Sequence, residues 1–130
     1  MSAPTGARQY LQTQVQSRTP LELVVMLYDG AIGAADLARD ATVAGNLPVR
    51  REGLSRLVAI VGQLQATLDM ERGGQIAVDL DRLYKWIIVR LMDTMMRRDA
   101  KPIQDVRDVL ATLREAWQII AAQHLASQQP

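Results

Sequence analysis

The sequence predicts an all-α fold, an antiparallel up-down-up-down four-helix bundle with a partly ordered N-terminal arm. Apolar residues recur at alternating spacings of three and four along four stretches of about 20 residues each, the pattern of helices that bury one face. No stretch alternates apolar and polar residues with a period of two, so no strand is expected. The short connections make consecutive helices antiparallel, because such a loop cannot span the length of a helix.

The first helix has a well-marked start and end. Thr19 can accept a hydrogen bond from the backbone of Glu22, whose side chain reaches back to Thr19, and Pro20 stands in the first turn. This combination is a capping box. The inward positions that follow are Leu21, Val24, Tyr28, Ala31, Ala35 and Ala38. Gly45 is expected to end the helix.

Three further helices follow. Pro48 opens the second helix, and Gly73-Gly74 is expected to stop it, since adjacent glycines make a poor helix interior. A break from Asp99 to Pro102 separates the third helix from the fourth. The expected inward positions are Leu54, Leu57, Val61, Leu64 and Leu68 in the second helix, Ile76, Leu80, Tyr84, Ile87, Leu91 and Met95 in the third, and Ile103, Val106, Leu110, Leu113, Trp117 and Ile120 in the fourth.

The chain is expected to divide into three parts. Residues 1–18 are rich in Gln, Ser and Thr and form the arm, which carries Tyr10. Residues 19–125 form the four-helix bundle. Residues 126–130 are expected to be a disordered tail, as short polar termini often are.

Composition excludes several classes of protein. The 130 residues suffice for one domain with its own core, and a net charge of +1 argues against nucleic acid as a partner. No apolar run approaches the roughly 20 residues that cross a bilayer, so membrane insertion is not expected. The first eight residues lack the apolar run of a signal peptide, and the chain has no cysteine. We therefore expect a cytoplasmic protein.

A catalytic site or cofactor is not expected either. The only histidine is His124, whereas a di-iron bundle needs a Glu-x-x-His pair on each of two helices. His124 continues the inward row of the fourth helix, which allows a phosphotransfer role, but a histidine at the end of a helix is far more often structural. Because the inward rows are almost entirely apolar, the interior is interpreted as a packing core, and no enzyme activity, metal or cofactor is expected.

Two helices carry more apolar residues than one inward row uses. In the first helix a second stripe of Leu23, Leu27, Ala34 and Ala41 is extended by Met26 and Leu37. In the third, Trp86 points away from the inward row and lies near Val89 and Met92, whereas Trp117 falls on its inward row and is expected to be buried. Either these stripes form a groove for a segment of another protein, or the first helix is central and a loop half covers Trp86. The groove hypothesis assigns partner contacts to Leu23, Leu27, Leu37, Trp86, Val89 and Met92, with Tyr10 in an arm that covers them.

The chain also resembles the FliS family of flagellar secretion chaperones. The residues that carry the resemblance are Tyr10, the stretches 17–23 (SRTPLEL) and 26–32 (MLYDGAI), Leu68-Asp69, the stretch 73–77 (GGQIA), Leu80, Leu83-Tyr84 and the stretch 113–117 (LREAW). They extend in order from about residue 10 to 117, over nearly the whole chain. The resemblance implies an antiparallel helical bundle, in agreement with the apolar pattern.

The resemblance also implies a function. Chaperones of this family bind the C-terminal region of newly made flagellin in the cytoplasm, prevent its premature polymerisation and deliver it to the flagellar type III secretion apparatus. By this resemblance, the arm with Tyr10 is expected to lie in the groove of the free chaperone, and the client is expected to be captured as helical pieces around the bundle. Export-gate components are candidate further partners, and a monomer or weak dimer is expected. The alternatives are a structural bundle that buries the same stripes by self-association and, with less support, a small bundle enzyme.

Overall fold

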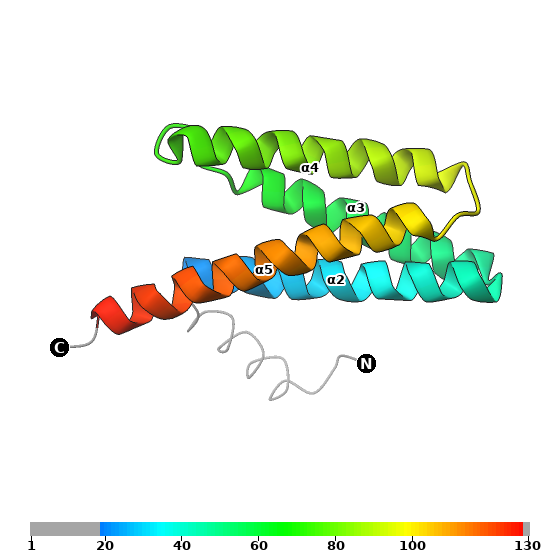
Figure 1. Ribbon diagram of the computed structural model, residues 1–130, viewed down its shortest axis with the longest axis horizontal. Helices are drawn as coiled ribbons and strands as arrows, with labels where there is room; N and C mark the ends of the chain where they lie inside the picture. Colours follow the sequence, from blue (N-terminus) through cyan, green and yellow to red (C-terminus); the bar gives the residue numbers. More distant parts are fainter. Residues whose placement is uncertain (1–18, 129–130) are drawn as a thin grey trace, which may run out of the picture.

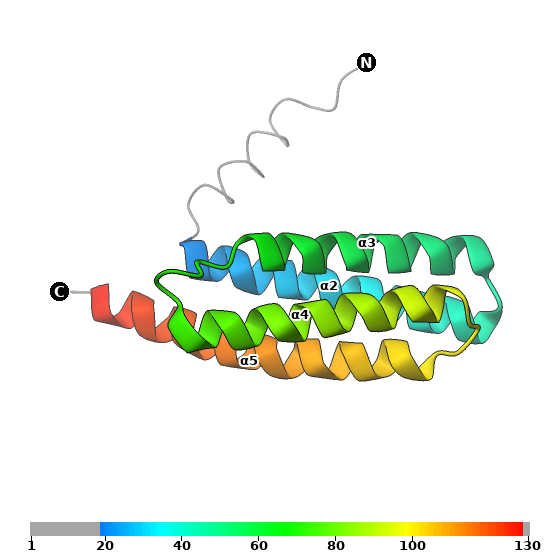
Figure 2. The ribbon, with the colours of Figure 1, turned by 90° about the horizontal axis from the view of Figure 1, so that it is seen from above.

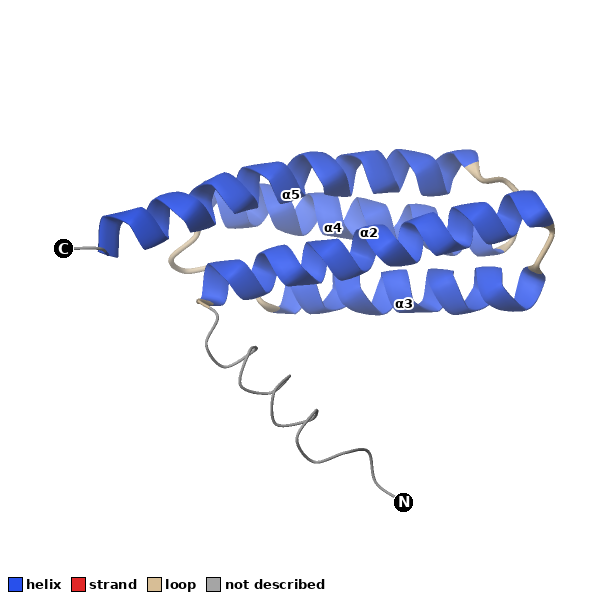
Figure 3. Ribbon diagram, turned by 90° about the horizontal axis from the view of Figure 1, so that it is seen from below, coloured by secondary structure: helices blue, strands red, loops and turns tan. Residues whose placement is uncertain are grey.

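A computed structural model describes residues 19–128. They form four helices, α2 (Pro20–Ala44), α3 (Leu47–Ala66), α4 (Gly74–Met95) and α5 (Lys101–Gln128). Between residues 19 and 128 there is no strand, and consecutive helices run in opposite directions (Figure 3). The predicted all-α four-helix bundle is therefore confirmed.

The four helices occupy the corners of the bundle in chain order. α2 packs closely along α3 and α5, while α4 packs against α3 and, least extensively, against α5. Figure 1 shows α4 along the top of the bundle and α2 along the bottom, and Figure 2 shows α3 and α5 on the two remaining sides. α2 and α4 are therefore diagonal, and their outward faces point away from each other.

The sequence signals at the start and end of α2 act as expected. The Glu22 amide donates to Thr19 Oγ1 at 3.2 Å, and the Thr19 amide donates to Glu22 Oε1 at 3.4 Å, which completes the capping box. Gly45 ends the helix in the left-handed region, with φ of 74°. The side chain of Asn46 then accepts from the Val49 amide at 3.3 Å, so α3 begins only two residues later.

The end of α3 differs from the prediction. α3 ends at Ala66, well before the two glycines that were expected to stop it. Thr67 Oγ1 donates to the Leu64 carbonyl at 2.7 Å, and Asp69 Oδ1 accepts from the amides of Glu71 and Arg72 at 3.1 and 3.0 Å. These side chains satisfy backbone groups that a longer helix would have used, so the chain turns early. The glycines instead lead into α4, with Gly74 at φ of 54°.

Most of the wide apolar face of α2 is buried against the other helices of the bundle. Ala34 and Ala41 are buried together with the inward row of the helix, so for these two alanines the central-helix interpretation is correct. Gly53 of α3 lies against the same face, where an added Cβ would come within 3.0 Å of Ala38 and 3.1 Å of the Ala34 carbonyl oxygen. The small side chains thus allow α2 and α3 to approach closely.

The interior is mainly apolar, with Arg50 and Thr94 as buried polar side chains, but some residues at the ends of the predicted inward rows are exposed. The buried core consists of Tyr28, Ala31, Ala34, Ala35, Ala38, Leu54, Leu57, Val61, Leu64, Tyr84, Ile87, Leu91, Ile103, Val106 and Leu110. Three residues predicted to point inward are exposed instead: Ile76 by 70%, Met95 by 41% and Ile120 by 44%. Each lies near an end of its helix or on the part of α5 that projects beyond the bundle, where fewer helices surround it (Figure 1).

The C-terminal boundary also differs from the prediction. α5 remains helical through Gln128, so the first three residues of the expected tail belong to the helix. Ser127 Oγ donates to the His124 carbonyl at 2.8 Å within this last turn. Ala126 and its neighbours need no partner helix to continue a helix that is already long. The remainder of the predicted tail and the predicted arm, residues 1–18, lie outside the described residues.

Candidate functional site

Three predicted partner residues form an exposed surface on α4, here called the α4 surface. Trp86, Val89 and Met92 are exposed by 45%, 68% and 57%, so the prediction of an exposed Trp86 is confirmed. Tryptophan provides a large contact area with few rotamers, and methionine adapts to partners of different shape. The α4 surface therefore has the chemistry of a protein-binding surface.

Trp86 is held by a charged neighbour. The Arg90 guanidinium lies 5.5 Å from the centroid of the Trp86 ring, and Arg90 Nη2 donates to Asp105 Oδ2 of α5 at 3.0 Å. Lys101 Nζ lies 2.8 Å from the other oxygen of the same carboxylate. Hydrogen bonds from Lys101 and from Arg90 hold the pKa of Asp105 below its usual range. This network fixes the indole against the α4–α5 edge.

The predicted partner residues on the first helix form the α2 surface, which consists of Leu23, Leu27 and Leu37. Leu23 and Leu27 are half-buried, and Leu27 packs against the core, whereas Leu37 is exposed. Leu37 lies nine residues after the buried Tyr28, half a turn round the helix. The α2 surface therefore faces outward from the corner diagonal to α4.

The structure does not bring the two surfaces together into one groove. Trp86 follows the buried Tyr84 by two residues and points outward from α4, just as Leu37 points outward from α2. Because the two helices are diagonal, a single segment cannot contact both surfaces without passing round the bundle (Figure 2). Tyr10, the seventh predicted partner residue, lies outside the described residues.

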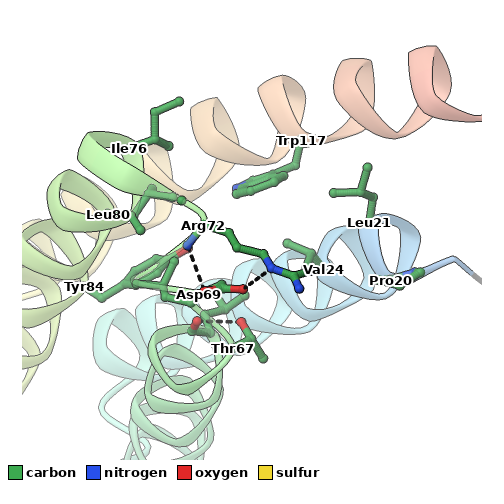
Figure 4. A pocket seen from close by; sticks show the side chains of 14 residues that line it. Pro20, Leu21, Val24, Thr67, Asp69, Arg72, Ile76, Leu80, Tyr84 and Trp117 are labelled. Atoms are coloured by element: carbon green, nitrogen blue, oxygen red, sulfur yellow. Dashed lines mark hydrogen bonds and ion pairs between the residues drawn. The ribbon is translucent and has the colours of Figure 1, made fainter.

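An apolar pocket that the sequence analysis missed lies at one end of the bundle, and we call it the end pocket. Its volume is about 340 Å³. Its walls are mostly apolar side chains, and its lining consists of Pro20, Leu21, Val24, Leu64, Thr67, Leu68, Asp69, Arg72, Gly73, Ile76, Ala77, Leu80, Tyr84 and Trp117. Figure 4 shows side chains from α2, α4 and α5 facing one another across it, with Arg72 and Asp69 of the α3–α4 connection beside them.

Two aromatic side chains that line the end pocket, Tyr84 and Trp117, are hydrogen-bonded to the buried Tyr28 behind it. The hydroxyl oxygens of Tyr28 and Tyr84 lie 2.5 Å apart, and Trp117 Nε1 donates to the Tyr28 oxygen at 3.3 Å. Burial raises the pKa of both phenols, and the contact with Tyr28 raises that of Tyr84 further. Trp117 is only partly buried, contrary to the prediction, because one side of its ring lines the pocket.

The end pocket could have been anticipated from the topology. An antiparallel bundle places the start of the first helix, the start of the third and the later turns of the fourth at the same end. Leu21, Ile76 and Trp117 occupy these positions, so their expected inward rows converge there. The missing information was the early end of α3, which leaves this end open between Ala66 and Gly74.

The pocket suits apolar side chains and not acid–base chemistry. Its charged members, Asp69 and Arg72, lie at the connection and are 3.8 Å from each other in an exposed ion pair. Within residues 19–128 no cluster of three histidine, cysteine, aspartate or glutamate side chains could hold a metal ion. No helix in the described part of the chain is both long enough and apolar enough to span a membrane.

Comparison with known proteins decides the family. A family model described as flagellar protein FliS matches residues 3–124. The chain belongs to the FliS family. The match includes α2, α3, α4 and α5 as far as residue 124, and with them the residues of the α2 surface, the α4 surface and the end pocket.

Curated FliS relatives come from several bacteria. The flagellar secretion chaperone FliS of Salmonella typhimurium is 36% identical over 126 residues, which cover 93% of each chain. The corresponding FliS of Vibrio cholerae is 30% identical over 88% of this chain and 84% of its own. The flagellar secretion chaperone FliSB of Pseudomonas aeruginosa is 30% identical over 90% of this chain and 96% of its own. These relatives match this chain over most of their length.

Proposed function

We propose that this protein is a flagellar secretion chaperone that binds the C-terminal region of flagellin in the cytoplasm. It keeps the subunit from polymerising early and delivers it to the flagellar type III secretion apparatus. Membership of the FliS family supports the chaperone role. The walls of the end pocket and the exposed apolar residues support a binding role and not an enzymatic one.

The observation that carries the client proposal is the placement of the apolar surfaces. The α2 surface and the α4 surface lie on opposite sides of the bundle, and the end pocket lies at one end of it. A compact partner would cover only one of them. An unfolded segment that forms short helices as it binds can cover all three, and the burial of large apolar area offsets the loss of its conformational entropy.

The arm with Tyr10 is proposed to cover part of this apolar surface in the free chaperone. Residues 1–18 join the bundle at Thr19, directly before Pro20 and Leu21, which line the end pocket. Tyr10 is nine residues from that junction, a length of chain that can extend to about 30 Å. It can therefore reach the pocket. Covering this surface would limit self-association, in keeping with a monomer or weak dimer.

The client proposal is tested by binding measurements on single variants. Leu37→Ala and Trp86→Ala would be titrated with a C-terminal flagellin fragment by isothermal titration calorimetry. Truncating an anchoring side chain costs about 2 kcal/mol, so we expect the dissociation constant to rise roughly thirtyfold for Trp86→Ala and less for the smaller Leu37. Gln63→Ala, an exposed polar position on α3, is the control and should bind like the wild type. Wild-type affinity in both apolar variants would refute these surfaces.

A self-associating structural bundle is the second candidate, since exposed apolar side chains on α4 and α5 could also pair with another copy. Size-exclusion chromatography distinguishes the two. A chaperone elutes as a monomer or weak dimer and forms a larger complex when the flagellin fragment is added. A structural bundle elutes as an oligomer at all concentrations and does not bind the fragment.

Contact with export-gate components is proposed as a later step, in which the chaperone delivers its client.

A further inference from the structure

A second cavity lies at the opposite end of the bundle from the end pocket, and we call it the arginine cavity. Its volume is about 650 Å³, and its lining consists of Leu47, Arg50, Arg51, Leu54, Ser55, Met95, Met96 and Arg98. The lining residues come from the start of α3 and from the end of α4 and the connection after it. Figure 1 shows these two segments at the same end of the bundle, beside the α2–α3 turn. It combines apolar walls with three guanidinium groups.

The positive charge of this cavity is not balanced by neighbouring carboxylates. In the described part of the chain, no aspartate or glutamate lines it. The acidic residues nearest in sequence are engaged elsewhere. Glu52 pairs with Arg56 at 3.8 Å, Asp93 pairs with Arg97 at 3.7 Å, and Asp99 Oδ1 accepts from the Lys101 amide at 3.0 Å. The cavity therefore presents a local excess of positive charge on a chain whose net charge is only +1.

The three arginines differ in their role. Arg50 is buried, and its guanidinium donates to the Thr94 carbonyl at 2.6 Å, to the Arg97 carbonyl at 2.5 Å and to Thr42 Oγ1 at 2.9 Å. Arg50 thus holds the end of α4 in place. Arg51 and Arg98 are exposed and have no ion-pair partner among residues 19–128. These two guanidinium groups are therefore available to form ion pairs with carboxylates of another molecule.

The apolar wall of the cavity continues the α4 surface. Met92 lies in the last turn of α4 and belongs to the α4 surface, and Met96, which caps that helix four residues later, lines the cavity. Val89 lies a further turn toward the other end of the helix. A helix that docks along this row would place its next turn over the arginine cavity.

We propose that the arginine cavity binds an acidic amphipathic helical segment of the flagellin client. Apolar side chains of that segment contact Leu47, Met95 and Met96, and its carboxylates pair with Arg51 and Arg98. Guanidinium groups pair well with carboxylates because their donors match both oxygens. Continuity with the α4 surface assigns the segment to the client, so this inference rests on the proposed function. To that function the inference adds that the recognised segment is acidic, and that Arg51 and Arg98 bind its carboxylates.

The test compares two variants with equal change in net charge. Arg51→Glu/Arg98→Glu reverses the two exposed arginines of the cavity. Arg56→Glu/Arg82→Glu reverses two exposed arginines on α3 and α4 that do not line it. Both are titrated with the C-terminal flagellin fragment at low and high salt, after circular dichroism and thermal melts establish that each is folded. We expect the cavity variant to bind roughly tenfold or more weakly at low salt, and the control to stay within about threefold of the wild type.

Two further results identify the interaction. Wild-type affinity should fall as salt rises, and that fall should disappear or reverse in the cavity variant, because salt then screens a repulsion between like charges. A fragment whose acidic residues are replaced by amides should bind the wild type weakly and lose nothing further with the cavity variant. If the wild type binds but the cavity variant binds like the control, the arginine cavity is not part of the interface. If the wild type fails to bind the fragment, the proposed function is overturned together with this inference.

Discussion

The hydroxyl oxygens of Tyr28 and Tyr84 lie 2.5 Å apart inside the bundle and join two helices that are diagonal to each other. Trp117 of α5 donates a further hydrogen bond to the Tyr28 oxygen. Elsewhere in the buried core, contacts are almost entirely apolar and do not specify which helix faces which. This polar link gives the bundle a directional contact across its centre, at the inner wall of the end pocket.

The Tyr28–Tyr84 pair predicts a fall in stability at high pH. Burial raises the pKa of both phenols in the folded state, whereas unfolded tyrosines release their protons near pH 10. The stabilisation is therefore complete below about pH 10 and is lost as the pH rises above it. Tyr84→Phe removes one of the two titrating groups. Above pH 10 the unfolding free energy of the variant should therefore fall less steeply than that of the wild type, and the two slopes should differ by about 1.4 kcal/mol per pH unit. Urea unfolding at about pH 9 and pH 11 measures this, and parallel curves for the two proteins would contradict it.

Arg50 is predicted to stabilise the fold from within the arginine cavity. Arg50→Ala leaves the Thr94 and Arg97 carbonyls without their donor, and we expect it to lower the free energy of unfolding by roughly 3 kcal/mol. Arg50→Lys should recover little of this, because an ammonium group lacks the forked donors that reach several acceptors. Arg51→Ala, at an exposed neighbouring position, is the control and should change stability by less than about 0.5 kcal/mol. Chemical denaturation decides between them.

Two glycines of α3 are predicted to respond in opposite directions to alanine. Gly53→Ala places a Cβ 3.0 Å from the backbone nitrogen of Ala38, so α2 and α3 must separate, and a loss of about 1–3 kcal/mol is expected. Gly62→Ala meets nothing within 4 Å and should stabilise the helix by about 0.5–1 kcal/mol. Thermal melts of both variants test the packing of α2 on α3. A stabilised Gly53→Ala would show that the two helices are farther apart than described.

The α2 and α4 surfaces are predicted to act independently in client binding. Leu37 and Trp86 are exposed on helices that are diagonal in the bundle, so the losses of binding energy in the double variant should add within about 0.5 kcal/mol. Calorimetric titration of the wild type, the two single variants and the double variant with the flagellin fragment provides the cycle. A strongly non-additive result would mean that one client helix couples the two surfaces.

Much of the fold was predictable because its signals are local. The capping box at Thr19 and the left-handed Gly45 act through hydrogen bonds within a few residues, so the sequence alone identifies them. The end of α3 was not predictable from the two glycines. Several weak local preferences compete there. The hydrogen bonds of the Thr67 and Asp69 side chains end the helix before the chain reaches the glycines.

The candidate sites were less predictable because they depend on distances between helices. Helical periodicity identified Trp86 and Leu37 as outward residues, but it could not show that their helices are diagonal. Nothing in the pattern of α3 distinguished Arg50, yet it is 6% exposed and hydrogen-bonded to carbonyls 44 and 47 residues away in sequence. Such contacts follow from the packing of α4 on α3, about which the pattern of either helix alone carries no information.

The small residues between α2 and α3 limit how a chaperone of this kind can adapt to new clients. Where Ala34, Ala38 and Gly53 meet, any larger side chain would push the helices apart. The outward face of α4, from Trp86 to Met96, can change in size and charge without disturbing that contact. We therefore expect chaperones that serve different flagellins to diverge mainly along α4, while the alanine face of α2 stays small. A library randomised at Val89, Met92 and Met96 should consequently yield folded proteins with altered client preference.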